Sequence, residues 1–161
     1  MSGTPVSGET SPNTSMATGF GTLTWDAAAN TLSYDFTVKG LNFNQVTGMQ
    51  FYSGAAGMTG PLAFGQLNPP QDTGTQLNPT QDKGDFTTII MNPDGSWEVK
   101  GVWDLTDPAS IPITNFAPVL SSATPPPAGS STVGSPVPLY WNVSTITFPD
   151  GEIRGQLVPT P

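Results

Sequence analysis

Residues Thr31-Leu32-Ser33-Tyr34-Asp35-Phe36-Thr37-Val38 alternate polar and apolar side chains without a break. Successive side chains of a β-strand point to opposite faces. This stretch therefore predicts a strand that buries its leucine, tyrosine, phenylalanine and valine and turns its polar residues to solvent. Residues 21–26 alternate in the same way, and residues 27–30 have the length of a hairpin connection. The two stretches predict an antiparallel hairpin.

Working outward from this hairpin, further strand-like runs follow at short intervals, separated by turn sequences. They span residues 49–52, 62–67, 86–91, 97–103, 139–147 and 153–158. Pro-Asp-Gly precedes two of these runs, at 93–95 and 149–151. In such turns proline presets φ, aspartate bonds the backbone and glycine accepts a positive φ. The pattern predicts an all-β fold, an antiparallel Greek-key β-sandwich of about eight strands with long Pro- and Gly-rich loops.

Length and charge narrow the function classes. The 161 residues fit a single domain over 1–161, and the net charge of −8 makes the surface acidic. An acidic surface repels phosphate backbones and anionic lipid, so we expect no nucleic-acid partner. No apolar run is long enough to span a bilayer, so we expect no membrane insertion. The charge-poor, cysteine-free composition predicts an extracellular or cell-surface protein, and we expect that a signal peptide has been removed.

Two segments depart from the strand rhythm and are predicted to be loop insertions, at about 66–85 and 115–138. In the first, the pattern Gln-Leu-Asn-Pro-x-Gln-Asp-x-Gly occurs twice, at 66–74 and 76–84. It is either a duplicated ligand or calcium loop or a duplication that lengthens a surface loop. One acid per repeat offers few calcium ligands, which favours the second interpretation. The other segment contains Pro125-Pro126-Pro127, and prolines do not form a central strand.

Several stretches in sequence order resemble the CHRD (chordin-type) domain family. Residues 17–26 with 30–34 resemble the opening strands of that family, and Ser7-Gly8-Glu9 its entry segment. Gly54-Ala55-Ala56-Gly57 with Gly60-Pro61 is similar to its glycine-rich central loop. Residues 140–145 and 149–157 resemble its closing hairpin. The resemblance covers nearly the whole chain, and it implies a sandwich similar to that of Cu/Zn superoxide dismutase.

Many members of the family carry His-x-His just before the glycine-rich loop and another histidine in the closing hairpin. The matching positions here hold Gln50, Tyr52 and Ser144, and the chain contains no histidine and no cysteine. Copper and zinc sites in proteins need imidazole or thiolate ligands. We therefore expect no copper or zinc site and no superoxide dismutation.

Other catalytic arrangements also lack their residues. Nucleophile–histidine pairs are excluded by composition, and a carboxylate pair for glycoside hydrolysis would have to come from acids placed elsewhere. Those acids lie in turns (Asp26, Asp94, Asp107, Asp150) or on solvent-facing strand positions (Asp35, Glu98). We expect no enzymatic activity. Arg154 and Glu152 in the closing hairpin are the candidate interaction charges, since Arg154 could clamp a carboxylate bidentately, but an arginine that braces the sandwich through an internal pair is the favoured interpretation.

We expect no cofactor; calcium is the one metal that remains open, although simple solvation of the surface acids is the favoured interpretation. The candidate ligands are Asp72, Asp82 and Asp85 on one loop, and Asp104 with Asp107 on another. The four tryptophans, Trp25, Trp97, Trp103 and Trp141, could form a sugar-stacking platform, but their apolar neighbours favour a place in the core. Two functions remain open. The chain is a structural or interaction module that binds protein, itself included as a homo-oligomer or polymer, or it is a calcium- or small-ligand-binding module using the acidic loops.

Overall fold

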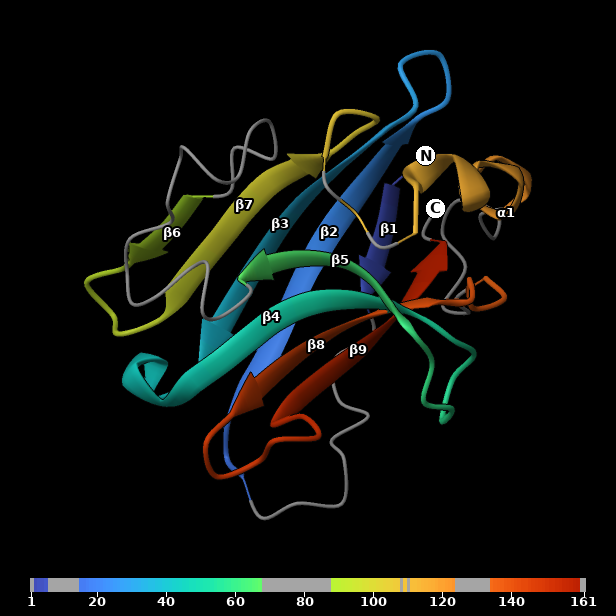
Figure 1. Cartoon of the computed structure of the whole chain (residues 1–161). Coiled ribbons are helices and arrows are strands. Elements are labelled where there is room, and N and C mark those ends of the chain that lie inside the picture. The colour runs from blue at the N-terminus through green and yellow to red at the C-terminus, as the bar shows by residue number, and fades with distance from the viewer. Residues whose placement is uncertain are drawn as a thin grey trace.

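The computed structural model describes the backbone of residues 2–5, 15–67, 88–107, 109, 111–123 and 134–159, and the side chains of these residues except 2–5, 66 and 67. Strands dominate this described part of the chain (Figure 1). In order they are β1 Ser2–Pro5, β2 Thr18–Asp26, β3 Thr31–Lys39, β4 Val46–Ser53, β5 Leu62–Leu67, β6 Thr88–Met91, β7 Trp97–Trp103, β8 Leu139–Thr145 and β9 Ile153–Pro159. The helical elements are the short α1 Ala117–Ser122 and two 3-10 turns, η1 Phe43–Gln45 and η2 Ile113–Asn115.

The strands follow the order β5-β4-β8-β9-β1-β2-β3-β7-β6, and every neighbouring pair is antiparallel. In Figure 1, β4, β5, β8 and β9 form one layer across a second layer built from β2, β3, β7 and β6. Strand β1 joins the layers, since it pairs with β9 on one side and with β2 on the other. The all-β antiparallel sandwich is confirmed. Strand β1 was not predicted, because Ser2-Gly3-Thr4-Pro5 has no apolar alternation and is placed by its two neighbours.

The hairpin that decides the fold forms as its alternation predicts. Strands β2 and β3 pair along their whole length, from Thr18 opposite Lys39 to Asp26 opposite Thr31. All four apolar side chains of β3 are buried, and Phe36 and Val38 are 0% exposed. In the connecting turn, the Asp26 carboxylate accepts from the amides of Ala28 and Ala29. The period of two thus fixes which face of the first layer meets the second.

Stacked aromatic rings fill the space between the layers. The rings of Phe36 and Trp141 come from opposite layers and stack with centroids 4.1 Å apart. Trp103 stacks on Phe64 at 5.1 Å and is fully buried. Burial of such rings is a major apolar contribution to stability. The core position predicted for the tryptophans is confirmed for Trp25, Trp103 and Trp141, which are buried, and for Trp97, which packs against the core and stacks on Phe43.

The segment 115–138 is more than the loop that was predicted. Its first part forms α1, which buries Leu120, and Phe116 and Val137 on either side of the helix also belong to the core. The Trp25 indole donates a hydrogen bond of 2.9 Å to Ser121 Oγ, which ties α1 to β2. The prolines obscured this helix, but proline is tolerated in the first turn of a helix, where Pro118 lies. Residues 68–87, most of the first predicted insertion, lie outside the described residues.

No helix in the described ranges has the length and apolar character needed to cross a membrane.

Candidate functional site

A polar pocket of about 600 Å³ opens on the outer face of the layer formed by β4, β8 and β9. Strand alternation creates it: Phe51, Trp141 and Val143 point into the core, so the residues between them point outward. Pairing then brings the outward residues together, with Tyr52 opposite Tyr140 and Asn142 opposite Arg154. The pocket is lined by Tyr52, Gly57, Thr59, Tyr140, Asn142, Ser144, Pro149, Asp150 and Arg154.

The guanidinium group of Arg154 is held in a fixed position at this pocket. Its guanidinium carbon lies 3.6 Å from the centre of the Tyr140 ring, a cation–π contact. Arg154 Nη2 donates to the backbone carbonyls of Met58 at 2.6 Å and Ala55 at 3.2 Å. Arg154 Nε is buried and has no hydrogen-bond partner among the described residues. The side chain is therefore fixed while part of its donor capacity stays unused.

Arg154 also differs in its charge environment from the other described cations. Lys39 pairs with Asp94 at 3.1 Å, and Lys100 pairs with Glu98 at 2.9 Å and Asp35 at 3.3 Å. Within the part of the chain that the structure describes, Arg154 alone among the cations has no acidic side chain within ion-pairing distance. Asp150 lines the same pocket from its exposed rim.

The glycine-rich loop 54–60 forms one wall of the pocket and is fastened to β8 and β9 by polar side chains. The Gly60 amide donates to the Tyr140 hydroxyl at 3.2 Å, and Gln156 Nε2 donates to the Gly54 carbonyl at 3.0 Å. The loop passes so close to β4 that a Cβ on Gly60 would lie 1.5 Å from the Ser53 carbonyl oxygen. Arg154 adds the two further bonds to this loop described above. The wall is thus set by contacts between residues about a hundred positions apart.

Gln50, Tyr52 and Ser144, the positions that the resemblance predicts to correspond to family histidines, lie on this same face, on β4 and β8. The Tyr52 hydroxyl donates to Gln50 Oε1 at 2.7 Å, and Ser144 Oγ accepts from Asn142 Nδ2 at 3.0 Å. Burial, and after it the neighbouring Tyr140, raises the pKa of Tyr52, so its phenol stays neutral and is a poor ligand for a metal ion. An amide, a phenol and a hydroxyl already engaged with neighbours do not fit copper or zinc.

Glu152 does not share the contacts of Arg154. Its two carboxylate oxygens accept from Ser15 Oγ at 2.6 Å and from Thr145 Oγ1 at 2.8 Å, and the residue is largely buried. Glu152 therefore holds the segment just before β2 and the end of β8 at the closing hairpin. The internal bracing expected of Arg154 is present, but it goes to backbone carbonyls of the loop.

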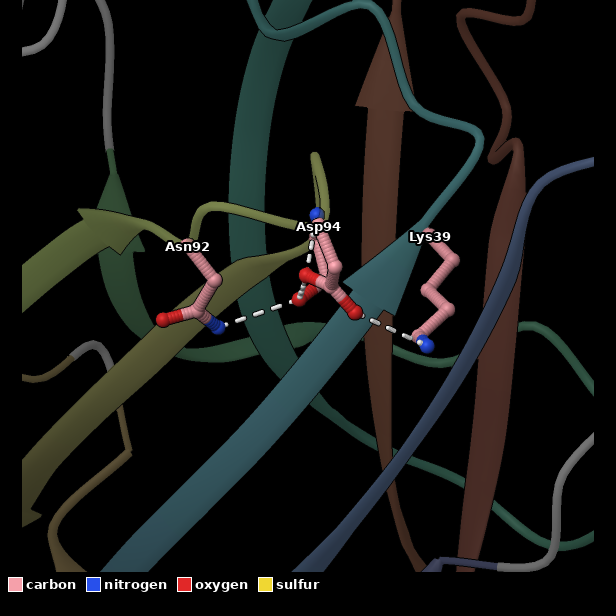
Figure 2. A network of polar contacts seen from close by, with 4 residues as sticks. Lys39, Asn92 and Asp94 are labelled. Carbon is pink, nitrogen blue, oxygen red and sulfur yellow. Dashed lines mark hydrogen bonds and ion pairs between the residues drawn. The ribbon is translucent and has the colours of Figure 1, made fainter.

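The other acids among the described residues lie in turns and on the opposite layer. In the turn between β6 and β7, Asp94 accepts from the hydroxyl and amide of Ser96 and from Lys39, and Asn92 bonds the same serine (Figure 2). The Ser96 hydroxyl first, then its amide and Lys39, lower the pKa of Asp94 to about 2.

The calcium candidates fall in two places. Asp104 accepts from the amide and hydroxyl of Thr106, while Asp107 accepts from the Asp104 amide, so both cap one turn. Asp72, Asp82 and Asp85 lie outside the described residues. In the described ranges, no three Asp or Glu side chains gather as a metal site would require.

Sequence reasoning found Arg154 but missed the pocket around it. The sequence places Tyr140 and Asn142 in a strand of the closing hairpin without marking them as pocket residues, and the carbonyls of Ala55 and Met58 carry no signal in a side-chain pattern. The alternation along β8 indicates which of its side chains point outward. This signal predicts that Tyr140, Asn142 and Ser144 form one polar row on the outer face.

Comparison with known proteins identifies the family of the chain. The CHRD domain family matches residues 3–157, nearly the whole chain. No curated protein and no solved structure matches the chain. The family match extends from the strand that joins the two layers to the closing hairpin that carries Arg154, and on it the chain belongs to the CHRD domain family.

Proposed function

We propose that this chain is a non-catalytic structural or interaction module, placed outside the cell or on its surface, that associates with further copies of itself. Membership of the CHRD family and the charge-poor, acidic, cysteine-free composition support the extracellular placement. The observation that carries the self-association is strand β6, at one end of the strand order.

Strand β6 has exposed apolar side chains, and among the described residues it lies at one end of the strand order. Strand β7 is its one hydrogen-bonded neighbour within the described part of the chain. Its sequence Thr88-Ile89-Ile90-Met91 carries no charge, and Ile90 and Met91 are 47% and 63% exposed. Natural edge strands are commonly protected by charges or proline, and an unprotected edge favours pairing with another strand. The opposite end of the strand order is partly covered, since the Ile111 amide donates to the Ala63 carbonyl of β5.

The distribution of charge around β6 favours pairing of this strand with a second copy of the chain. Two chains of net charge −8 repel each other, so they associate best where the local charge is balanced. Around β6 the acids are largely offset by lysines: Lys100 pairs with Asp35 and Glu98, and Lys39 pairs with Asp94. An antiparallel pairing of β6 with β6 of a second copy makes a two-fold contact in which the lysines reduce like-charge repulsion.

Light scattering on a sizing column tests this function. We expect wild-type protein to show a concentration-dependent oligomer, and Ile90→Lys to shift it to a monomer, because a lysine on the edge opposes pairing. Phe20→Lys is the matched control, since Phe20 is 56% exposed on β2, away from the edge, and we expect this variant to keep the oligomer. A wild-type monomer at all concentrations overturns the proposal.

The same column run with calcium and with a chelator addresses the other function predicted from the sequence. Association that is independent of calcium supports the edge-strand contact. Association that requires calcium points instead to the acidic loops with Asp72, Asp82 and Asp85 and contradicts the role given to β6. Surface biotinylation of intact cells tests the extracellular placement.

A further inference from the structure

The pocket beside Arg154 has no part in strand pairing, since it lies on the other layer of the sandwich, and it presents a built set of polar groups. We propose that it binds a small ligand carrying a carboxylate next to hydroxyl groups, the chemistry of a uronic acid or a hydroxy acid. This inference stands apart from self-association through β6, and either can fail without the other.

The carboxylate is assigned to Arg154. Its guanidinium is fixed in place by the Tyr140 ring and by the carbonyls of Ala55 and Met58, so little side-chain entropy is lost when it binds. Carbonyls and a ring compensate the positive charge only in part, and no described acid pairs with it. Arg154 Nε is also a buried donor without a partner. Arg154 Nη2 is used by the loop carbonyls and Nε is buried, so the carboxylate is assigned to Nη1, which can bind it through a charge-assisted hydrogen bond.

The hydroxyl groups are assigned to the neutral lining of the pocket. Asn142 lies directly opposite Arg154 across the β8–β9 pair, so the two side chains stand about 5 Å apart at Cβ. Asn142 with Ser144, and Thr59 on the loop, offer donors and acceptors of the kind that bind hydroxyls. Asp150 at the rim can accept from a ligand hydroxyl, although its charge opposes the carboxylate.

The size and shape of the pocket agree with a small ligand. A volume of about 600 Å³ lies within the range of small-molecule sites. The wall formed by loop 54–60 is fastened by Tyr140, Arg154 and Gln156, so the pocket exists before a ligand arrives. Preformed sites bind with a smaller ordering cost than sites that must fold around the ligand.

NMR titration of the full chain with four probes tests the ligand chemistry. Glucuronate carries both features, glucose lacks the carboxylate, acetate lacks the hydroxyls, and tartrate is a hydroxy acid without a ring. We expect glucuronate or tartrate to shift the resonances of Asn142 and the Arg154 side chain, and glucose and acetate to bind at least about tenfold more weakly. Tighter binding of glucuronate identifies the ligand class as a uronic acid, and tighter binding of tartrate identifies it as a hydroxy acid. Equal binding of glucose, or shifts confined to another surface, overturns the proposal.

Variants at the pocket separate charge recognition from folding. Arg154→Gln is expected to weaken binding of the better acid by about tenfold or more and to leave glucose binding unchanged. Because Arg154 also fastens the loop, a second variant leaves it in place. Thr59→Glu puts a negative charge on the exposed rim and should weaken binding of the acid by about fivefold, whereas Thr59→Gln, its neutral match, should weaken it less because it adds no charge. Asp150→Asn should strengthen binding of the acid, since it removes a like charge. Unchanged affinity in Thr59→Glu and Asp150→Asn contradicts the inferred site.

Discussion

The Tyr140 hydroxyl accepts a hydrogen bond of 3.2 Å from the Gly60 amide, while the ring of the same tyrosine lies under Arg154. One buried side chain thus serves two contacts: its oxygen fastens the glycine-rich loop, and its face supports the cation of the pocket. The two contacts can be separated, because phenylalanine keeps the ring and removes only the oxygen.

Tyr140→Phe is expected to destabilise the domain by about 1 kcal/mol, since the Gly60 amide loses its acceptor. Amide hydrogen exchange should be faster at Gly60, with little change at residues in β2 and β3. Tyr52→Phe is the matched control: it removes a hydroxyl that bonds Gln50 on the same strand, so the Gly60 amide should exchange as in wild type. Equal protection of Gly60 in Tyr140→Phe and wild type would contradict the role given to this bond.

Gly151→Ala is expected to damage the pocket from its outer side. Gly151 has φ +132, a conformation that alanine rarely adopts, and a Cβ there would lie 2.3 Å from Asn142 Oδ1. We expect a loss of about 2–3 kcal/mol in the free energy of unfolding, together with displacement of the Asn142 side chain.

Gly95→Ala is the matched control that measures the cost of backbone strain without the contact between a Cβ at position 151 and Asn142. Gly95 has φ +78 in the other Pro-Asp-Gly turn, and a Cβ there meets nothing within 4 Å. Its cost should be only the backbone term, about 1 kcal/mol. Urea unfolding of both variants gives the comparison, and a Gly95→Ala variant as unstable as Gly151→Ala would show that the contact with Asn142 costs nothing.

Titration of Asp94 reports on the turn next to the β6 edge. The pKa of Asp94 is about 2, below its usual value of 3.8, and the largest cause is the hydrogen bond from the Ser96 hydroxyl. Because the folded-state pKa is depressed, the stability that this carboxylate contributes is present above the unfolded value near 3.8 and is lost as pH falls through about 2. We therefore expect the midpoint of the Asp94 carboxyl carbon, followed by NMR, near pH 2.

Substitutions of the Asp94 partners should follow the order of their contributions. Ser96→Ala removes the largest one and should move the midpoint a long way back toward 3.8, whereas Lys39→Met, which removes an exposed ion pair, should move it less. A larger shift in Lys39→Met would mean that the ion pair, and not the serine, sets the acidity of Asp94.

Particular residues show how far sequence reasoning reached. The alternation of 31–38 correctly placed Leu32, Tyr34, Phe36 and Val38 in the core, because the period of two depends only on local backbone geometry. The helix Ala117–Ser122 was missed, because a single turn beside a proline-rich stretch has too little periodicity to be recognised. Arg154 was singled out as a charge that could clamp a carboxylate, but the partners that fix it were not predicted.

The sequence by itself determined the faces of the strands, the acidic surface, and the lack of imidazole or thiolate ligands at Gln50, Tyr52 and Ser144. Each of these follows from residue type or from spacing along the chain. Only the tertiary structure decided that the loop 54–60 folds against Tyr140 and Arg154, and that the Arg154 side chain lines a pocket. The physical reason is that these contacts join residues about a hundred positions apart. They depend on which strands become neighbours, and the local pattern of a strand carries no information about that.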